Sequence, residues 1–117
     1  MQVLTFPGHV AEWRWKYFKP NEILSPAGLA YYADTGICLV SRRALDKLDA
    51  FRDELGAKLW VNYAGMKYRG YRSYEENIRL PGSVSFSQHV QGHAFDVTSP
   101  DMDIESLYYT ALDFGWT

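Results

Sequence analysis

The stretch Ser87–Asp96, which reads Ser-Gln-His-Val-Gln-Gly-His-Ala-Phe-Asp, constrains this chain more than any other. It places an imidazole, His89, and a carboxylate, Asp96, on either side of Gly92. Because glycine lets the backbone turn sharply, we expect a hairpin-like segment in which residues 94–97 form a short, half-buried strand. Imidazole nitrogen and carboxylate oxygen are both common zinc ligands. We therefore interpret His89 and Asp96 as part of a zinc site.

The alternation of an extended strand assigns the neighbours of Asp96 to two faces. Ala94 shares the face of Asp96 and leaves room beside a metal, whereas Phe95 and Val97 point to the other face and can pack in the core. His93 lies an odd number of positions from Asp96, so it faces away and is not counted as a ligand. The alternative is a surface loop with an ordinary histidine and an aspartate that caps a turn.

The bulk composition predicts one compact domain over residues 1–117. The chain is 47% hydrophobic and 16% aromatic, which is enough for a packed core. Its net charge of −2 argues against nucleic acid or an anionic membrane as a partner. The start Met1–Val3 resembles no signal peptide, and no apolar run is long enough to span a membrane. We expect a monomer.

The single cysteine, Cys38, excludes an intrachain disulfide. A lone cysteine can be a nucleophile. Cys38 lies in the apolar run Ile37–Val40, however, which favours a buried structural thiol.

Periodicity predicts two core helices, over residues 42–55 and 104–114, each followed by a glycine. Ser41 is the expected N-cap of the first helix, and Asp101 or Asp103 that of the second. The remaining expectations are strands at 13–17 and 58–63, a helical turn at 21–24 that Ser25-Pro26 stops, a second helical turn at 73–78, and a loop at 31–36.

The whole pattern Ser-x-His-x-x-Gly-x-Ala-x-Asp, filled by Ser87, His89, Gly92, Ala94 and Asp96, resembles the signature of the zinc D-alanyl-D-alanine carboxypeptidases and dipeptidases. This peptidase M15-like family includes phage peptidoglycan endopeptidases, and the hedgehog signalling domain shares its fold. The resemblance implies an α+β fold of the hedgehog/DD-peptidase type, with a small antiparallel sheet packed with helices and without its C-terminal strand. It implies His89 and Asp96 as metal ligands and a role for Ser87 in positioning the substrate or His89.

The resemblance extends to Tyr17–Glu22 and to Gly70–Ser73 with Asn77, which are similar to the entry segment and the "Gly-Tyr-Arg-Ser…Asn" loop of the small carboxypeptidase-like branch. In that family the loop arginine polarises the substrate carbonyl or holds a carboxylate. Arg72 is therefore the implied catalytic residue. The alternative is a surface arginine in a basic loop.

The function implied is a zinc metallopeptidase that hydrolyses peptidoglycan stem peptides, in the cytoplasm until release if it is a phage-type lysin. One departure matters, because the family draws its third ligand, a histidine, and its general base from a strand beyond the second helix. No histidine follows His93. The sequence therefore predicts either a fragment or a degenerate protein. The alternatives are a catalytically inactive metal- or cell-wall-binding module, or a structural protein, on the same fold.

Overall fold

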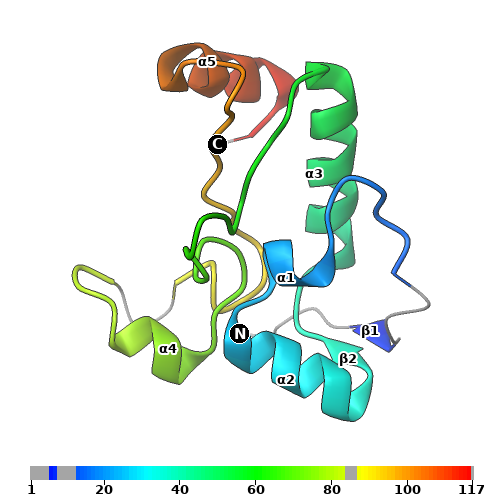
Figure 1. Ribbon diagram of the computed structural model, residues 1–117, viewed down its shortest axis with the longest axis vertical. Coiled ribbons are helices and arrows are strands. Elements are labelled where there is room, and N and C mark those ends of the chain that lie inside the picture. The colour runs from blue at the N-terminus through cyan, green and yellow to red at the C-terminus, as the bar shows by residue number, and fades with distance from the viewer. Residues whose placement is uncertain (1–5, 8–12, 84–86, 117) are drawn as a thin grey trace.

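A computed structural model describes residues 6–7, 13–83 and 87–116. These residues mix helices with a little β-structure (Figure 1). In chain order the elements are β1 (Phe6–Pro7), α1 (Pro20–Ile23), α2 (Pro26–Thr35), β2 (Ile37–Cys38), α3 (Arg42–Leu55), α4 (Tyr74–Ile78) and α5 (Ile104–Phe114). The strands β1 and β2 pair antiparallel, with Phe6 opposite Cys38.

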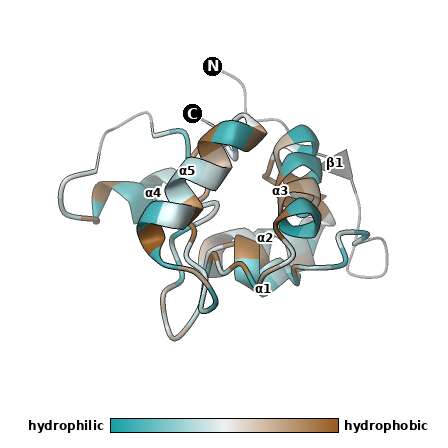
Figure 2. Cartoon of the chain, turned by 90° about the horizontal axis from the view of Figure 1, so that it is seen from above, coloured by the Kyte–Doolittle hydropathy of each residue, from teal (hydrophilic) through white to brown (hydrophobic). Residues whose placement is uncertain are grey.

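The helix α3 has the predicted bounds and buries Leu45, Leu48 and Phe51. The Ser41 hydroxyl accepts the Ala44 N–H at 3.2 Å, which confirms the expected N-cap. Figure 2 shows both polar and apolar residues along α3, as expected for a helix that packs on one side. Each buried side chain of this kind stabilises the fold by roughly 1.5–3 kcal/mol.

The helix α5 also has the predicted bounds, and it packs against α3. Asp103 is the N-cap and accepts the Ser106 N–H at 3.0 Å. The rings of Phe51 and Phe114 lie 5.2 Å apart, centroid to centroid, across this contact. The expected helical turns at 21–24 and 73–78 are confirmed as α1 and α4.

The loop predicted at 31–36 is wrong, because residues 31–35 are the last turns of α2. Pro26, which was expected to stop a helix, stands instead in the first turn of α2, where its missing N–H and fixed φ are tolerated. The Ser25 hydroxyl caps this turn by accepting the Gly28 N–H at 3.2 Å.

None of the three segments predicted to be strands, residues 13–17, 58–63 and 94–97, forms a strand. Residues 13–17 form no ladder, and the indole of Trp15 is buried and donates to Asp46 at 2.8 Å. The segment 58–63 makes one isolated bridge, Trp60 with Thr98. Residues 94–97 are half-buried apart from the exposed Asp96, but carry no strand pairing. Alternation of side chains along a segment does not show whether a neighbouring segment is aligned to pair with it.

The core groups side chains from all parts of the described chain. Its buried members are Trp15, Phe18, Ile23, Leu24, Tyr32, Cys38, Val40, Leu45, Leu48, Phe51, Leu59, Val61, Tyr71 and Leu107. Within the described ranges, no helix is both long and apolar enough to cross a membrane.

Cys38 is fully buried, as predicted for a structural thiol. Burial raises the pKa of the thiol to about 12, although a backbone hydrogen bond at Val40 acts in the opposite direction. Because only the thiolate is nucleophilic, native protein should react with iodoacetamide near pH 8 far more slowly than a free cysteine does. Mass spectrometry of alkylated protein with and without denaturant checks this. Equal rates in the two conditions would show that the thiol is accessible.

Candidate metal site

The segment from Ser87 to Gly92 is a compact turn. The Val90 N–H donates to the Ser87 carbonyl at 3.1 Å, and the Gly92 N–H donates to the His89 carbonyl at 3.1 Å. Gly92 has a φ of 72°, in the left-handed region that favours glycine. Its carbonyl accepts the Ser41 N–H at 2.9 Å, so the start of α3 holds the turn in place.

His89 is fixed by a hydrogen bond between its Nδ1 and the carbonyl oxygen of Gly70, at 2.9 Å. Because a carbonyl only accepts, Nδ1 carries the proton and, in the neutral ring, Nε2 keeps a lone pair. Gly70 is itself closely packed, since a Cβ there would lie 2.2 Å from the Ile23 carbonyl oxygen. The close contact between the backbones of Gly70 and Ile23, at the end of α1, therefore sets the direction of the imidazole.

Asp96 reaches the same point from the other side of the turn. Its backbone N–H donates to the Arg69 carbonyl at 2.7 Å, and its Oδ1 lies 3.5 Å from Nε2 of His89. The neighbouring imidazole of His89 lowers the pKa of Asp96, partial burial opposes this, and the positive charges of Arg69 and Arg72 lower the pKa further. The carboxylate is therefore ionised at neutral pH.

The donor chemistry of this pair fits a shared zinc ion. With Nδ1 directed at the Gly70 carbonyl, Nε2 and the carboxylate of Asp96 are stable side by side only with a cation or a proton between them. The separation of 3.5 Å exceeds the roughly 2.7–2.9 Å of a charge-assisted hydrogen bond. It is close to the separation of about 3.3–3.4 Å between two tetrahedral zinc ligands that each lie about 2.0–2.1 Å from the metal.

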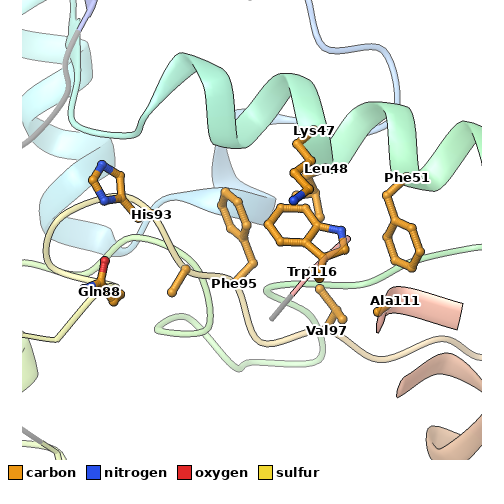
Figure 3. Close-up of a pocket in the computed structure, with 10 residues that line it drawn as sticks. Lys47, Leu48, Phe51, Gln88, His93, Phe95, Val97, Ala111 and Trp116 are labelled. Carbon is orange, nitrogen blue, oxygen red and sulfur yellow. The ribbon is translucent and has the colours of Figure 1, made fainter. Parts of the chain in front are cut away.

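The structure brings together His89 and Asp96 but no third ligand. Within residues 6–7, 13–83 and 87–116, no group of three or more His, Cys, Asp or Glu side chains could hold a metal. His93 does not join the pair. It lines a pocket of about 500 Å³ together with Phe95 and Val97 (Figure 3), and neither His89 nor Asp96 lines this pocket. Ala94 lines it as well, so the prediction that Ala94 and Phe95 lie on opposite faces is wrong. The described residues therefore bring together two candidate ligands, one fewer than the three protein ligands that a catalytic zinc site keeps.

Arg72 and Ser87 lie beside the pair and are joined to it. The guanidinium of Arg72 donates to Asn77 Oδ1 at 2.9 Å, to the Tyr68 carbonyl at 3.0 Å and to Ser87 Oγ at 3.4 Å. The buried Ser87 hydroxyl also accepts the His89 N–H at 3.1 Å. Arg72 thus has a fixed orientation, and some of its N–H groups are still available to a substrate.

Two supporting asparagines complete the surroundings of the site. Asn77 is fully buried and orients Arg72, as its place in the loop motif suggests. Asn62, which sequence reasoning missed, accepts the Arg69 N–H at 3.0 Å and donates to the Leu24 carbonyl at 3.1 Å. A polar residue directly after the apolar run Leu59–Val61 was the available signal for it.

Gly92 offers a test of the turn that carries His89. A Cβ there would lie 2.6 Å from the Leu39 carbonyl oxygen, whereas a Cβ on Gly56, at a similar φ of 66°, would meet nothing within 4 Å. We expect Gly56→Ala to cost about 1 kcal/mol and Gly92→Ala about 3 kcal/mol or more, because steric overlap adds to backbone strain. Urea unfolding followed by tryptophan fluorescence measures both. Equal losses would contradict the close packing.

The chain was also compared with known proteins. The family model described as Peptidase M15 matches residues 16–113, which include all four candidate site residues. No curated protein and no solved structure matches the chain. The matched region covers most of the sequence, and the chain therefore belongs to the peptidase M15 family.

Proposed function

We propose that this protein is a zinc metallopeptidase that hydrolyses peptidoglycan stem peptides, as a D-Ala-D-Ala carboxypeptidase or an endolysin-type endopeptidase. Membership of the peptidase M15 family, which is generally zinc-dependent, supports the metallopeptidase. The observation that carries the proposal is that Nε2 of His89 lies 3.5 Å from Oδ1 of Asp96 while Nδ1 is held by the Gly70 carbonyl. The peptidoglycan substrate and the hedgehog/DD-peptidase type of fold rest on the signature motif around this pair.

His89 and Asp96 would hold the zinc ion, which when bound lowers the pKa of a coordinated water and polarises a carbonyl. Gly70 keeps the imidazole oriented through Nδ1, an outer hydrogen bond of the kind that metal-binding histidines usually make. Arg72 has N–H groups available for the negative charge that develops on the substrate carbonyl oxygen. The Ser87 hydroxyl bonds to both the Arg72 guanidinium and the His89 backbone N–H, and so holds the two residues at a fixed separation.

The partners follow from the same proposal. The ligand is a peptide of the cell wall, the protein acts as a monomer, and neither nucleic acid nor membrane is a partner. In a phage-type lysin, it would remain cytoplasmic until release.

A second function is favoured by one observation. The described residues supply two candidate ligands, and a catalytic zinc site keeps three protein ligands. A metal- or cell-wall-binding module without activity, or a structural protein on the same fold, would need no third ligand. Zinc content and hydrolysis distinguish these possibilities.

Metal analysis tests the ligand pair. We expect about one zinc ion per chain after refolding with zinc and gel filtration, and its loss in His89→Ala and in Asp96→Ala. His93→Gln is the matched control and should keep its zinc, because His93 lines a pocket that neither His89 nor Asp96 lines. Protein without zinc under these conditions, or loss of zinc in the His93 variant alone, would refute the ligand assignment.

Zymography on purified cell walls tests the activity. We expect clearing by the wild-type protein and a loss in Asp96→Ala that exceeds the roughly 10–100-fold typical of losing an outer-shell partner. If the wild-type protein holds zinc but does not clear the walls, the binding module is supported. Equal clearing by both proteins would contradict a mechanism that uses Asp96.

A further inference from the structure

The helix α5 carries more apolar side chains than its contact with α3 uses. Of its eleven residues, all of them described, only Leu107 is buried. Four large side chains of the same helix stay exposed, namely Ile104 at 65%, Tyr108 and Tyr109 at 58% each, and Leu112 at 41%. Monomeric proteins seldom expose a contiguous apolar patch of more than a few hundred Å² without a partner for it. We call these four side chains the α5 face.

The residues of the α5 face lie together on one side of the helix. Ile104, Tyr108 and Leu112 follow one another at intervals of four residues, so they are neighbours along the helix. The ring of Tyr109 lies beside that of Tyr108, with centroids 5.4 Å apart. The helix α3 differs, because its exposed residues are charged except for Ala50. The apolar exposure is therefore particular to α5.

The charges around the α5 face are all negative. Residues 101–117 contain four acidic residues and no lysine, arginine or histidine, since all twelve lysines and arginines of the chain precede them. Asp101 and Asp103 already accept backbone N–H groups of the protein. Glu105 and Asp113 are exposed, and among the residues that the structure describes neither forms an ion pair. These two carboxylates are available to a partner.

Glu105 and Asp113 border the α5 face along one edge. With Tyr109 between them they form a second row at intervals of four residues, next to the row that begins at Ile104. Asp113 lies in the last turn of α5, which has no basic residue and where the helix dipole disfavours a negative charge. Its charge therefore does not serve the stability of the helix.

A second copy of the chain matches this surface poorly. If two α5 helices packed antiparallel, Glu105 of one copy would lie near Asp113 of the other, and in a parallel pair each carboxylate would lie near its own counterpart. Like charges brought together at an interface disfavour that pairing. The complementary surface is one that combines apolar side chains with positive charges.

We propose that the α5 face binds a helix of another protein, one whose apolar stripe is flanked by lysine or arginine. Helices recognise one another through apolar side chains spaced three and four residues apart. Cations beside that stripe would lie opposite Glu105 and Asp113, which favours association and fixes the direction of the bound helix. The helix α5 lies at the other end of the molecule from α4, which begins beside Arg72 (Figure 1). The partner is thus placed away from Arg72, and the inference does not depend on the proposed function.

Binding of a model helix tests the inference. The probe is a fluorescein-labelled peptide in which the heptad Leu-Lys-Lys-Leu-Leu-Lys-Leu is repeated three times, and it is compared with a version that has glutamate for lysine and with a scrambled version. We expect fluorescence anisotropy to show the tightest binding for the first peptide. Tyr108→Ser should weaken it about tenfold or more, because an aromatic anchor is lost. The double change Glu105→Gln with Asp113→Asn should weaken it roughly fivefold.

The matched controls lie on α4, where Ile78 and Glu75 are also exposed. Ile78→Ser and Glu75→Gln remove the same kinds of group and should leave the affinity unchanged. Serine and tyrosine have similar helix propensities, so Tyr108→Ser should keep its fold, which circular dichroism checks.

Several results would overturn the inference. They are absence of binding by the lysine peptide, equal binding of the glutamate or scrambled peptide, and an unchanged affinity in Tyr108→Ser. A dimer in sedimentation equilibrium that Tyr108→Ser dissociates would show that a second copy covers the α5 face. Binding to phosphatidylcholine vesicles that the same variant abolishes would show that the face contacts lipid instead.

Discussion

The hydrogen bond between the Gly70 carbonyl and Nδ1 of His89 is the interaction on which the rest of the site depends. It fixes the tautomer and leaves Nε2 as the atom that faces Asp96. The bond is possible because Gly70 has no side chain, so that its backbone can approach Ile23 closely. A small residue in a loop thus determines the chemistry of an imidazole almost twenty positions away.

A wider polar network keeps this loop in place. Glu76 accepts hydrogen bonds from the Ser73 N–H at 2.8 Å and from the Ser25 hydroxyl at 2.5 Å, so it joins the start of α4 to the cap of α2. The buried Asn62 joins α1 to the backbone of Arg69. Since unsatisfied buried polar groups are costly, these bonds favour one arrangement of the loop and hold Arg72 near His89.

The sequence predicted the helices better than the strands. The helices α3 and α5 combine an apolar face with a cap and a terminal glycine, so local signals agree with tertiary packing. Residues 58–63 and 94–97 alternate as strands do, but strand pairing depends on distant neighbours, and of these residues Trp60 alone forms a bridge, with Thr98. The helix α2 was missed because Ser25-Pro26 was interpreted as a stop when it is a cap followed by a first turn.

The proximity of the candidate residues was predictable from the sequence, but their geometry was not. The signature motif suggested His89 and Asp96 as candidates, and the loop motif suggested Arg72, yet no sequence pattern shows which nitrogen of His89 faces the carboxylate. The position of Arg69 likewise depends on the stacking of Tyr63 and Trp60, which the fold alone creates. Long-range backbone contacts, such as that between Asp96 and Arg69, set these orientations.

The central claim is that His89, oriented by Gly70, and Asp96 share a zinc ion through Nε2 and Oδ1. Nitrogen-15 NMR of the imidazole rings, recorded during a zinc titration near pH 8, tests it most directly. We expect His89 to carry its proton on Nδ1 throughout, with the Nε2 resonance shifting as zinc is added and not shifting in Asp96→Ala. A proton on Nε2 in the metal-free protein, or a response at His93 with none at His89, would contradict the claim.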